Sequence, residues 1–335
     1  MKYNRLREQI MKLLINEKQK GILQAELERK LKFSRSHISE TLKKLQNERK
    51  VEVRKVSSNI NRLWLPLYFP GTLNYQVRIG ILRSSEYVIH LSKLMDILED
   101  EKKNVAIRVY ESTIELLQDL NQSLLEIVMA PFYPSLLNSL IYENPIVCPV
   151  ASGGSAIVSL PGEDILYVSE TSTMAKFAQV YISSNRNIKM VSMGSMKKNI
   201  EQFLKQGGLI TLWEPYLSIA LKKHGVKIKS KYEELLFELP CCVITFSKLF
   251  YKTRNDLAHK IREIGIQKSK GNMSPEFKEK ICQILGFEES VILKSLESYH
   301  YFTDYSNFSI DSEKLGIYLT EGQKQEIFPL TDSRE

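Results

Sequence analysis

Two sets of side chains in this sequence have types and spacing suited to binding, and they lie in different parts of the chain. The first is a basic set within positions 1–70, which hold 17 Lys and Arg against 7 Asp and Glu. The second consists of hydroxyl, carboxylate and aromatic side chains that follow apolar runs after position 76. A basic surface suits a polyanion, and a solvated Lys-rich face is the alternative. Clustered hydroxyls and rings suit a small molecule.

The basic set is positioned by a predicted helix and a predicted hairpin. Ser34 is a candidate N-cap, and Ile38, Leu42 and Leu45 share one helical face, so the polar residues between them project elsewhere. Arg and Ser near a helix N-terminus suit base edges and phosphates in a major groove. The predicted DNA-binding residues are Arg35, Ser36, Ser39, Lys43 and Lys44 on the helix, and Arg54, Lys55 and Arg62 on the hairpin.

The elements around this set form a compact pattern. Apolar spacing predicts helices over 4–16 and around 23–31 ahead of the capped one, and alternation predicts strands at 51–56 and 62–65. The stretch 33–45 followed by 47–51 resembles the recognition helix and wing entry of MarR-like winged-helix repressors. That resemblance implies DNA binding by residues 1–66. Trihelical folds that contact proteins instead are the alternative.

Residues 67–75, which include Pro70-Gly71, are predicted as a linker, and strands alternate with helices after it. This alternation predicts a largely parallel sheet in an α/β domain over 76–335. One lobe is expected at about 76–150 and 240–335 and the other at about 151–239. Strand ends and helix starts are where such folds bind ligands.

Three stretches of the large domain carry a second resemblance: 130–133, 169–174 and 207–216, the last ending in Trp213-Glu-Pro-Tyr216. They resemble sulfonate-, nitrate- and thiamine-precursor-binding proteins over most of residues 75–300. The resemblance implies a type-2 periplasmic-binding-protein fold with a small molecule between two lobes. The fusion of such a domain to a winged helix resembles LysR-type regulators in its logic.

The predicted ligand-binding residues lie at the strand ends and helix starts of this domain. The set is Ser84, Ser85, Phe132, Tyr133, Ser152, Thr171, Ser172, Thr173, Trp213, Glu214 and Tyr216, and Arg83 and Glu111 share the strand-end position. Hydroxyls at a helix start offer an anion site, and plain N-capping is the alternative. Trp213 and Tyr216 suit stacking on a planar ring, and a purely structural role is the alternative.

Catalytic and metal-binding patterns are not found in the sequence. The four cysteines, Cys148, Cys241, Cys242 and Cys282, include no C-x-x-C pair, so reduced thiols with no metal and no cofactor are expected. No phosphate-binding loop or nucleophile elbow occurs, so the protein is not expected to be an enzyme. A phosphoribosyltransferase- or dehydratase-like enzyme on the same two-lobed fold, with an N-terminal interaction domain, is the alternative.

These patterns together predict a ligand-responsive transcriptional regulator. Its expected partners are double-stranded DNA, a small-molecule effector and a second copy in a homodimer, with no membrane. The amphipathic start of the chain lacks the apolar core of a signal segment, so a cytoplasmic location is expected.

Overall fold

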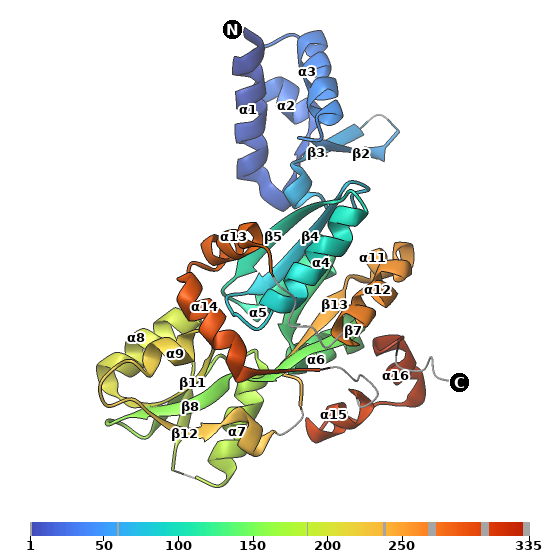
Figure 1. The fold of residues 1–335 in the computed structure, drawn as a ribbon. Helices are drawn as coiled ribbons and strands as arrows, with labels where there is room; N and C mark the ends of the chain where they lie inside the picture. Colours follow the sequence, from blue (N-terminus) through green and yellow to red (C-terminus); the bar gives the residue numbers. More distant parts are fainter. Residues whose placement is uncertain are drawn as a thin grey trace.

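The computed structural model describes residues 2–58, 60–185, 187–236, 239–266, 273–302 and 308–330. Figure 1 shows three parts in a row: N-terminal helices with a small sheet, a six-stranded sheet in the middle, and a five-stranded sheet at the far end. The chain therefore has mixed α/β architecture, and the two larger sheets form two lobes. The predicted end of the first lobe at residues 331–335 lies outside the described residues.

The N-terminal part packs three helices on a three-stranded sheet. Its helices are α1 (Lys2–Glu17), α2 (Gln24–Lys30) and α3 (Arg35–Asn47), and its strands β1 (Ile22–Leu23), β2 (Glu52–Ser57) and β3 (Ile60–Trp64) have the order β1-β3-β2. Leu6, Ile10, Ile38 and Leu42 are buried in one core, which is the apolar face that the sequence predicts. The Ser34 side chain accepts a bond from the His37 N–H, so the predicted N-cap is confirmed.

Arg78, a fully buried residue of β4 (Gln76–Leu82), fastens the linker to the middle sheet. Its guanidinium donates to the carbonyls of Pro66 at 3.2 Å, Phe69 at 2.5 Å and Gly71 at 2.5 Å. It also holds the buried carboxylate of Glu126, with Nη2 2.6 Å from Oε1. A charge this deep is stable only because every donor has a partner.

The middle sheet forms the first lobe and has the order β14-β7-β13-β6-β4-β5. Its other strands are β5 (Asn104–Tyr110), β6 (Ile127–Pro131), β7 (Ile146–Gly153), β13 (Cys242–Phe246) and β14 (Tyr299–Tyr301). Strand β4 is parallel to β5 and β6, but β13 is antiparallel to β6 and β7. The prediction of a largely parallel sheet is therefore wrong, because strands that return from the second lobe enter in the opposite direction.

Helices cover this sheet, and the largest apolar core lies between them and its strands. They are α4 (Val88–Asp100), α5 (Thr113–Asn121), α6 (Phe132–Tyr142), α11 (Lys248–Thr253), α12 (Asn255–Ile266), α13 (Pro275–Leu285), α14 (Glu289–Ser295), α15 (Phe308–Lys314) and α16 (Glu321–Ile327). In the described residues, no helix is both long enough and apolar enough to cross a bilayer.

The second lobe is smaller, and part of it packs in a core of its own. Its residues Ile157, Phe177 and Tyr232 belong instead to the largest core, which is continuous with the first lobe. Its strands β8 (Ser155–Leu160), β9 (Ile165–Tyr167), β10 (Lys189–Val191), β11 (Gly208–Trp213) and β12 (Lys227–Lys231) have the order β10-β9-β11-β8-β12. Its helices are α7 (Thr173–Ser183), α8 (Met196–Gln206), α9 (Tyr216–Ala220) and α10 (Tyr232–Leu235). This sheet is also mixed, since β8 is antiparallel to both of its neighbours.

The chain passes from the first lobe to the second at Gly153-Gly154. Both glycines have positive φ values, 79° and 62°. A Cβ atom on Gly154 would lie 2.3 Å from the Tyr299 ring, so a side chain at this position would displace β14. The crossing therefore requires glycine for both conformation and space.

Candidate functional site

A pocket lies between the two lobes and takes its walls from both. The volume open to water molecules is about 30 Å³ in this arrangement of the lobes. It is bordered on the first lobe by the loops after β4 and β5 and on the second by the start of α7 and the end of β11. The first lobe contributes Arg83, Ser84, Glu86, Tyr87, Tyr110 and Glu111, and the second contributes Ser172, Thr173, Met196, Trp213 and Tyr216. This is where two-lobed α/β folds present strand ends to a ligand.

Direct hydrogen bonds hold the lobes together at one side of this pocket. The Trp213 Nε1–H donates to the Arg83 carbonyl at 3.2 Å. The Glu214 carbonyl accepts from the Ser84 hydroxyl at 3.3 Å and from the Ser85 N–H at 3.4 Å. The two lobes are therefore in contact, and separating them breaks at least these bonds.

The hydroxyls at the start of α7 are already engaged in the protein. Ser172 is the N-cap and accepts from the Ala175 N–H at 3.2 Å. The Thr173 hydroxyl donates to the Cys241 carbonyl at 2.9 Å and accepts from the Tyr133 N–H at 3.2 Å. Capping, the alternative to an anion site, is therefore the role that the geometry displays.

Four aromatic rings surround the remaining space: Tyr87, Tyr110, Trp213 and Tyr216. Trp213 and Tyr216 meet edge to face with their centroids 6.1 Å apart. Tyr216 in turn meets Phe287 at 5.3 Å, which fixes its ring from the other side. Rigid rings of this kind offer apolar faces at a small cost in conformational entropy.

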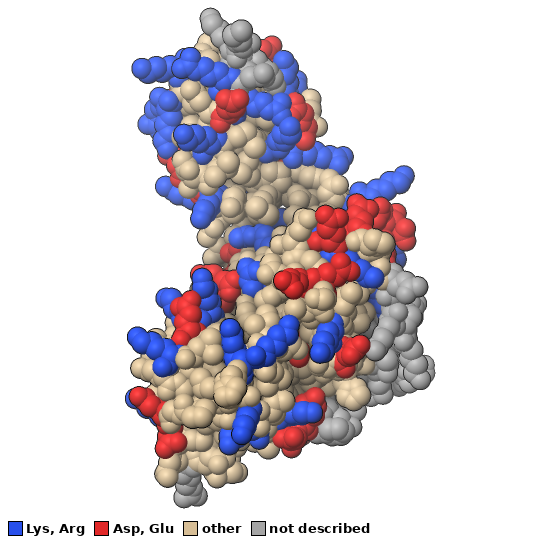
Figure 2. All heavy atoms as spheres, turned by 60° about the vertical axis from the view of Figure 1, so that its left-hand side comes forward, with Lys and Arg blue, Asp and Glu red and all other residues tan. Residues whose placement is uncertain are grey.

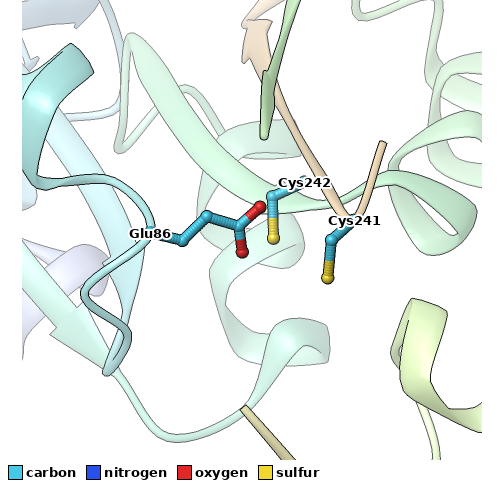
Figure 3. Close-up of side chains that lie close together, drawn as sticks. All are labelled: Glu86, Cys241 and Cys242. Carbon is cyan, nitrogen blue, oxygen red and sulfur yellow. The ribbon is translucent and has the colours of Figure 1, made fainter. Parts of the chain in front are cut away.

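Glu86, Cys241 and Cys242 form a polar cluster in the wall of the pocket, and Figure 3 shows their side chains close together. Glu86 is only 2% exposed, and its Oε1 has no hydrogen-bond partner. Burial raises the pKa of Glu86 to about 8, because a charged carboxylate is poorly solvated there. Burial also holds the pKa of the Cys242 thiol well above its ordinary value. The cluster is thus protonated and uncharged at neutral pH.

Arg83 is the one cation among the described residues that border the pocket. Its Nε donates to the Glu111 carboxylate at 2.8 Å, and its Nη1 donates to the Leu285 carbonyl. The guanidinium charge is therefore already balanced by a neighbouring carboxylate. Glu86 and Glu111 are the two acidic groups in the same walls.

Five of the predicted ligand-binding residues border this pocket, namely Ser84, Ser172, Thr173, Trp213 and Tyr216. The others lie outside its walls: Ser85, Phe132, Tyr133, Ser152, Thr171 and Glu214. Phe132 is fully buried in the first-lobe core. Glu214 points to a groove on the other side of the crossover, where its carboxylate accepts from the Ser218 N–H at 3.1 Å. Trp213 and Glu214 are adjacent, and consecutive positions at a strand end face opposite ways.

Sequence reasoning missed Glu86, Tyr87, Cys241 and Cys242. Glu86 lies in the loop between β4 and α4, and this loop faces the second lobe, since the neighbouring Ser85 N–H donates to the Glu214 carbonyl. The cysteines have the pattern of a buried strand, and β13 does begin at Cys242. A carboxylate two residues after Ser84, itself a predicted strand-end residue, is the one signal that pointed here.

The predicted DNA-binding residues lie on the N-terminal part, over which Lys and Arg gather in Figure 2. Arg54 donates to the Pro70 carbonyl at 2.7 Å and lies over the Phe69 ring, so it faces the linker. Arg62 donates to the Lys20 carbonyl at 3.2 Å, and Arg35 pairs with Glu28 at 3.2 Å. Ser36, Ser39, Lys43 and Lys44 lie on α3, and Lys55 on β2. Arg54 and Arg62 thus contact the protein's own backbone, whereas the Arg35 side chain is 89% exposed.

Comparisons with known proteins identify the fold of the large domain. No family model and no curated protein matches the sequence. A ligand-binding component of an ABC-type import system from Staphylococcus aureus, solved with zinc bound, aligns with a TM-score of 0.58 and 12% identity over 72% of this chain and 90% of its own. The periplasmic aliphatic sulfonate-binding protein of Escherichia coli gives 0.56 and 11% over 73% and 91%. The periplasmic nitrate-binding protein of Synechocystis gives 0.51 and 11% over 66% and 69%.

At these identities the similarity establishes the two-lobed periplasmic-binding-protein fold, and the predicted resemblance is confirmed to that extent. It also corrects the functional predictions. The neighbours are a ligand-binding component of an import system, a sulfonate-binding protein and a nitrate-binding protein, so the predictions of a transcriptional regulator and of its enzymatic alternative are wrong.

The DNA partner and the cytoplasmic location are wrong on the same finding, since two of these neighbours are periplasmic solute binders. The predicted homodimer loses its premise as well, because it followed from paired winged helices on DNA. Arg54 and Arg62 show the physical reason for the error: a basic sequence pattern does not distinguish a cation that binds a polyanion from one that binds the protein's own backbone.

Proposed function

We propose that this protein binds a small molecule between its two lobes, as a solute-binding protein. The observation that carries the proposal is the pocket whose walls come from both lobes, with Ser84 and Glu86 on one side and Trp213 on the other. The structural neighbours are themselves ligand-binding proteins, which also supports this role. Closure of the lobes on a ligand would bury most of a small molecule's surface.

The chemistry of the walls favours a planar ligand that is neutral or cationic. Four rings provide apolar faces, and the unpartnered Glu86 Oε1 is an acceptor for an N–H or O–H donor. Arg83 is already paired with Glu111 at 2.8 Å, so an anion would find no unbalanced positive charge among the described lining residues. Sulfonate and nitrate, the anions in the neighbours' names, are therefore expected to bind poorly.

We further propose the domain division that accompanies this function. Residues 1–66 form a winged helix-turn-helix fold, residues 67–75 a linker, and residues 76–335 the two-lobed domain, with lobe 1 at about 76–150 and 240–335 and lobe 2 at about 151–239. A separate apolar core in the N-terminal part supports the boundary near residue 66, and a second-lobe cluster that includes Val158 and Phe203 supports lobe 2. The largest core continues from the first lobe onto the second-lobe residues Phe177 and Tyr232. A three-helix core beside the β2–β3 hairpin supports the winged-helix assignment.

Intrinsic fluorescence tests the proposal, because the chain contains two tryptophans and one borders the pocket. In the Trp64→Phe variant, Trp213 is the sole tryptophan and reports on the pocket. We expect a saturable change in its emission with a member of a panel of small heteroaromatic amines and amides, and no change with alkanesulfonates or nitrate.

The matched control is Trp213→Phe, in which the remaining Trp64 lies in the N-terminal part and should not respond. An equal response in both variants would place binding elsewhere. A response to sulfonate or nitrate alone would overturn the assigned ligand class, and silence across the panel with an unchanged melting temperature would overturn ligand binding by this pocket.

A further inference from the structure

The cluster of Glu86, Cys241 and Cys242 combines ligand types that occur together in metal sites. One carboxylate oxygen and the two sulfurs all lie within 4.8 Å of one another. Glu86 comes from the loop between β4 and α4, whereas the cysteines stand at the start of β13, so the fold brings together residues far apart in the sequence (Figure 3). The expectation of no metal rested on C-x-x-C spacing, which two adjacent cysteines do not display.

The unpartnered oxygen of Glu86 is an independent sign that something is missing from the cluster. Glu86 is 2% exposed; its carboxyl group lies against both cysteine thiols and the Cys242 N–H, but its Oε1 has no hydrogen-bond partner among the described residues. Leaving a buried carboxyl oxygen without a partner costs free energy. By contrast, the buried carboxylate of Glu126 has its donors supplied by Arg78.

The separations suit a tetrahedral ion. Bonds of about 2.3 Å to sulfur and about 2.0 Å to oxygen place neighbouring ligand atoms roughly 3.5–3.8 Å apart. The three atoms reach that spacing from within 4.8 Å by small side-chain rotations. All three residues border the pocket, so an ion held by them would have its fourth position on the side of the pocket. Open positions of this kind distinguish ligand-binding metal sites from closed structural ones.

We propose that Glu86, Cys241 and Cys242 bind a thiophilic divalent cation of the Zn²⁺ class. Thiolate ligands select such ions over Mg²⁺ or Ca²⁺. On binding, the carboxyl group and both thiols each lose a proton to solvent, so one ion replaces up to three protons and leaves the cluster with a net charge of −1. The Tyr87 hydroxyl, 3.2 Å from the Cys242 sulfur, can donate to the thiolate and stabilise that charge.

The metal site is an addition to the proposed function. Only the binding of a solute at the open fourth position of the metal rests on that function. Its test therefore uses the metal alone. The reduced, chelator-treated full-length protein is titrated with Cd²⁺, and thiolate-to-cadmium charge-transfer absorption is followed. We expect one equivalent to bind, with proton release approaching three per ion when Zn²⁺ is titrated in weak buffer.

The variants Cys241→Ser and Cys242→Ser should each remove most of the absorption band. Cys148→Ser, in the buried strand β7, and Cys282→Ser, on α13, are the matched controls and should keep it. Glu86→Gln should retain the sulfur band but weaken Zn²⁺ binding by at least about tenfold, because one ligand is lost. Far-UV circular dichroism of each variant verifies folding.

Three results would overturn the site. They are the absence of a cadmium–thiolate band in the wild type, a band that survives both Cys241→Ser and Cys242→Ser, and a disulfide between these cysteines in the purified protein. If a variant does not fold, the proton count of the wild type decides, since adventitious surface binding would release few protons. Loss of the metal site with an intact Trp213 response would leave solute binding standing, and the reverse result would leave the metal site standing.

Discussion

Two buried carboxylates in the first lobe show opposite environments. Glu126 is 1% exposed and meets the Arg78 guanidinium at 2.6 Å and 3.0 Å and the Arg78 backbone N–H at 2.7 Å. Glu86 is 2% exposed and borders the pocket, with Oε1 unpartnered and two thiols for neighbours. Equal burial thus accompanies complete pairing in one region and incomplete pairing in the other.

The difference teaches how to separate a structural charge from a binding group in this fold. The Arg78–Glu126 pair joins the linker to the sheet and leaves no donor for an outside molecule. The Glu86 cluster keeps acceptor capacity at the edge of a cavity, at a cost in stability that only a bound species can recover. Pairing, rather than burial, is therefore the property that distinguishes the two.

The largest loss of stability is expected from breaking the Arg78–Glu126 pair. Arg78→Met leaves the Glu126 carboxylate buried without a cation and removes the bonds to three linker carbonyls. We expect a loss of about 3–5 kcal/mol in the free energy of unfolding, measured by denaturant titration.

Lys248→Met is the control for that variant. It removes an ion pair with Glu143 whose side chains are 42% and 56% exposed, and such pairs contribute about 0–1 kcal/mol. Equal losses in the two variants would show that the buried pair is no more important than a surface one.

The Glu86 cluster should instead make the stability of the protein depend on pH. The Glu86 pKa is raised to about 8, so the folded protein keeps a proton there that the unfolded chain has already lost. Stability is then highest at low pH and falls as pH rises toward 8, on the order of 1 kcal/mol per pH unit. The groups that face Glu86 are Cys241, Cys242, Tyr87, Tyr232, Tyr299 and Tyr301.

Thermal unfolding between pH 6.5 and pH 8, with a chelator present, isolates this effect. Burial lowers the pKa of His90 to about 4, so the unfolded chain still loses a proton from His90 near pH 6.5, and His90 adds a small slope of opposite sign at the lower end of that window. Glu86→Gln should flatten the dependence. A slope that is unchanged in the variant would assign it to another group.

The smallest loss of stability is expected at Glu214. Its carboxylate accepts from the Ser218 N–H at 3.1 Å and the Ser218 hydroxyl at 2.9 Å. Glu214→Gln keeps one oxygen and should cost about 1 kcal/mol in stability. Solute binding at Trp213 should remain, because Glu214 faces the other groove; a lost fluorescence response would contradict that separation.

The elements of the fold were largely predictable because their signals are local. Alternation located β2 to within a residue at each end, and Ser34 marked the start of α3. Strand β12 was missed because Lys227–Lys231 is rich in charge, as an exposed edge strand can be. The antiparallel direction of β13 depends on which strand it pairs with, and no local pattern encodes that choice.

The site was predictable only in part, for a similar reason. Strand ends and a helix start indicated Ser84, Thr173 and Trp213, which follow from topology. Burial of Glu86 and its approach to Cys241 arise when two lobes close on each other, and neither stretch carries a sign of the other. The basic N-terminal pattern led to a wrong prediction because the contact between Arg54 and the Pro70 carbonyl exists only in the folded protein, and the sequence pattern does not indicate it.

The grip of Arg78 on the carbonyls of Pro66, Phe69 and Gly71 has a mechanical consequence. Because Arg54 also donates to the Pro70 carbonyl, the connecting segment is hydrogen-bonded both to the N-terminal part and to the six-stranded sheet. These bonds connect the N-terminal part to the six-stranded sheet, and separating the two would require breaking all of them.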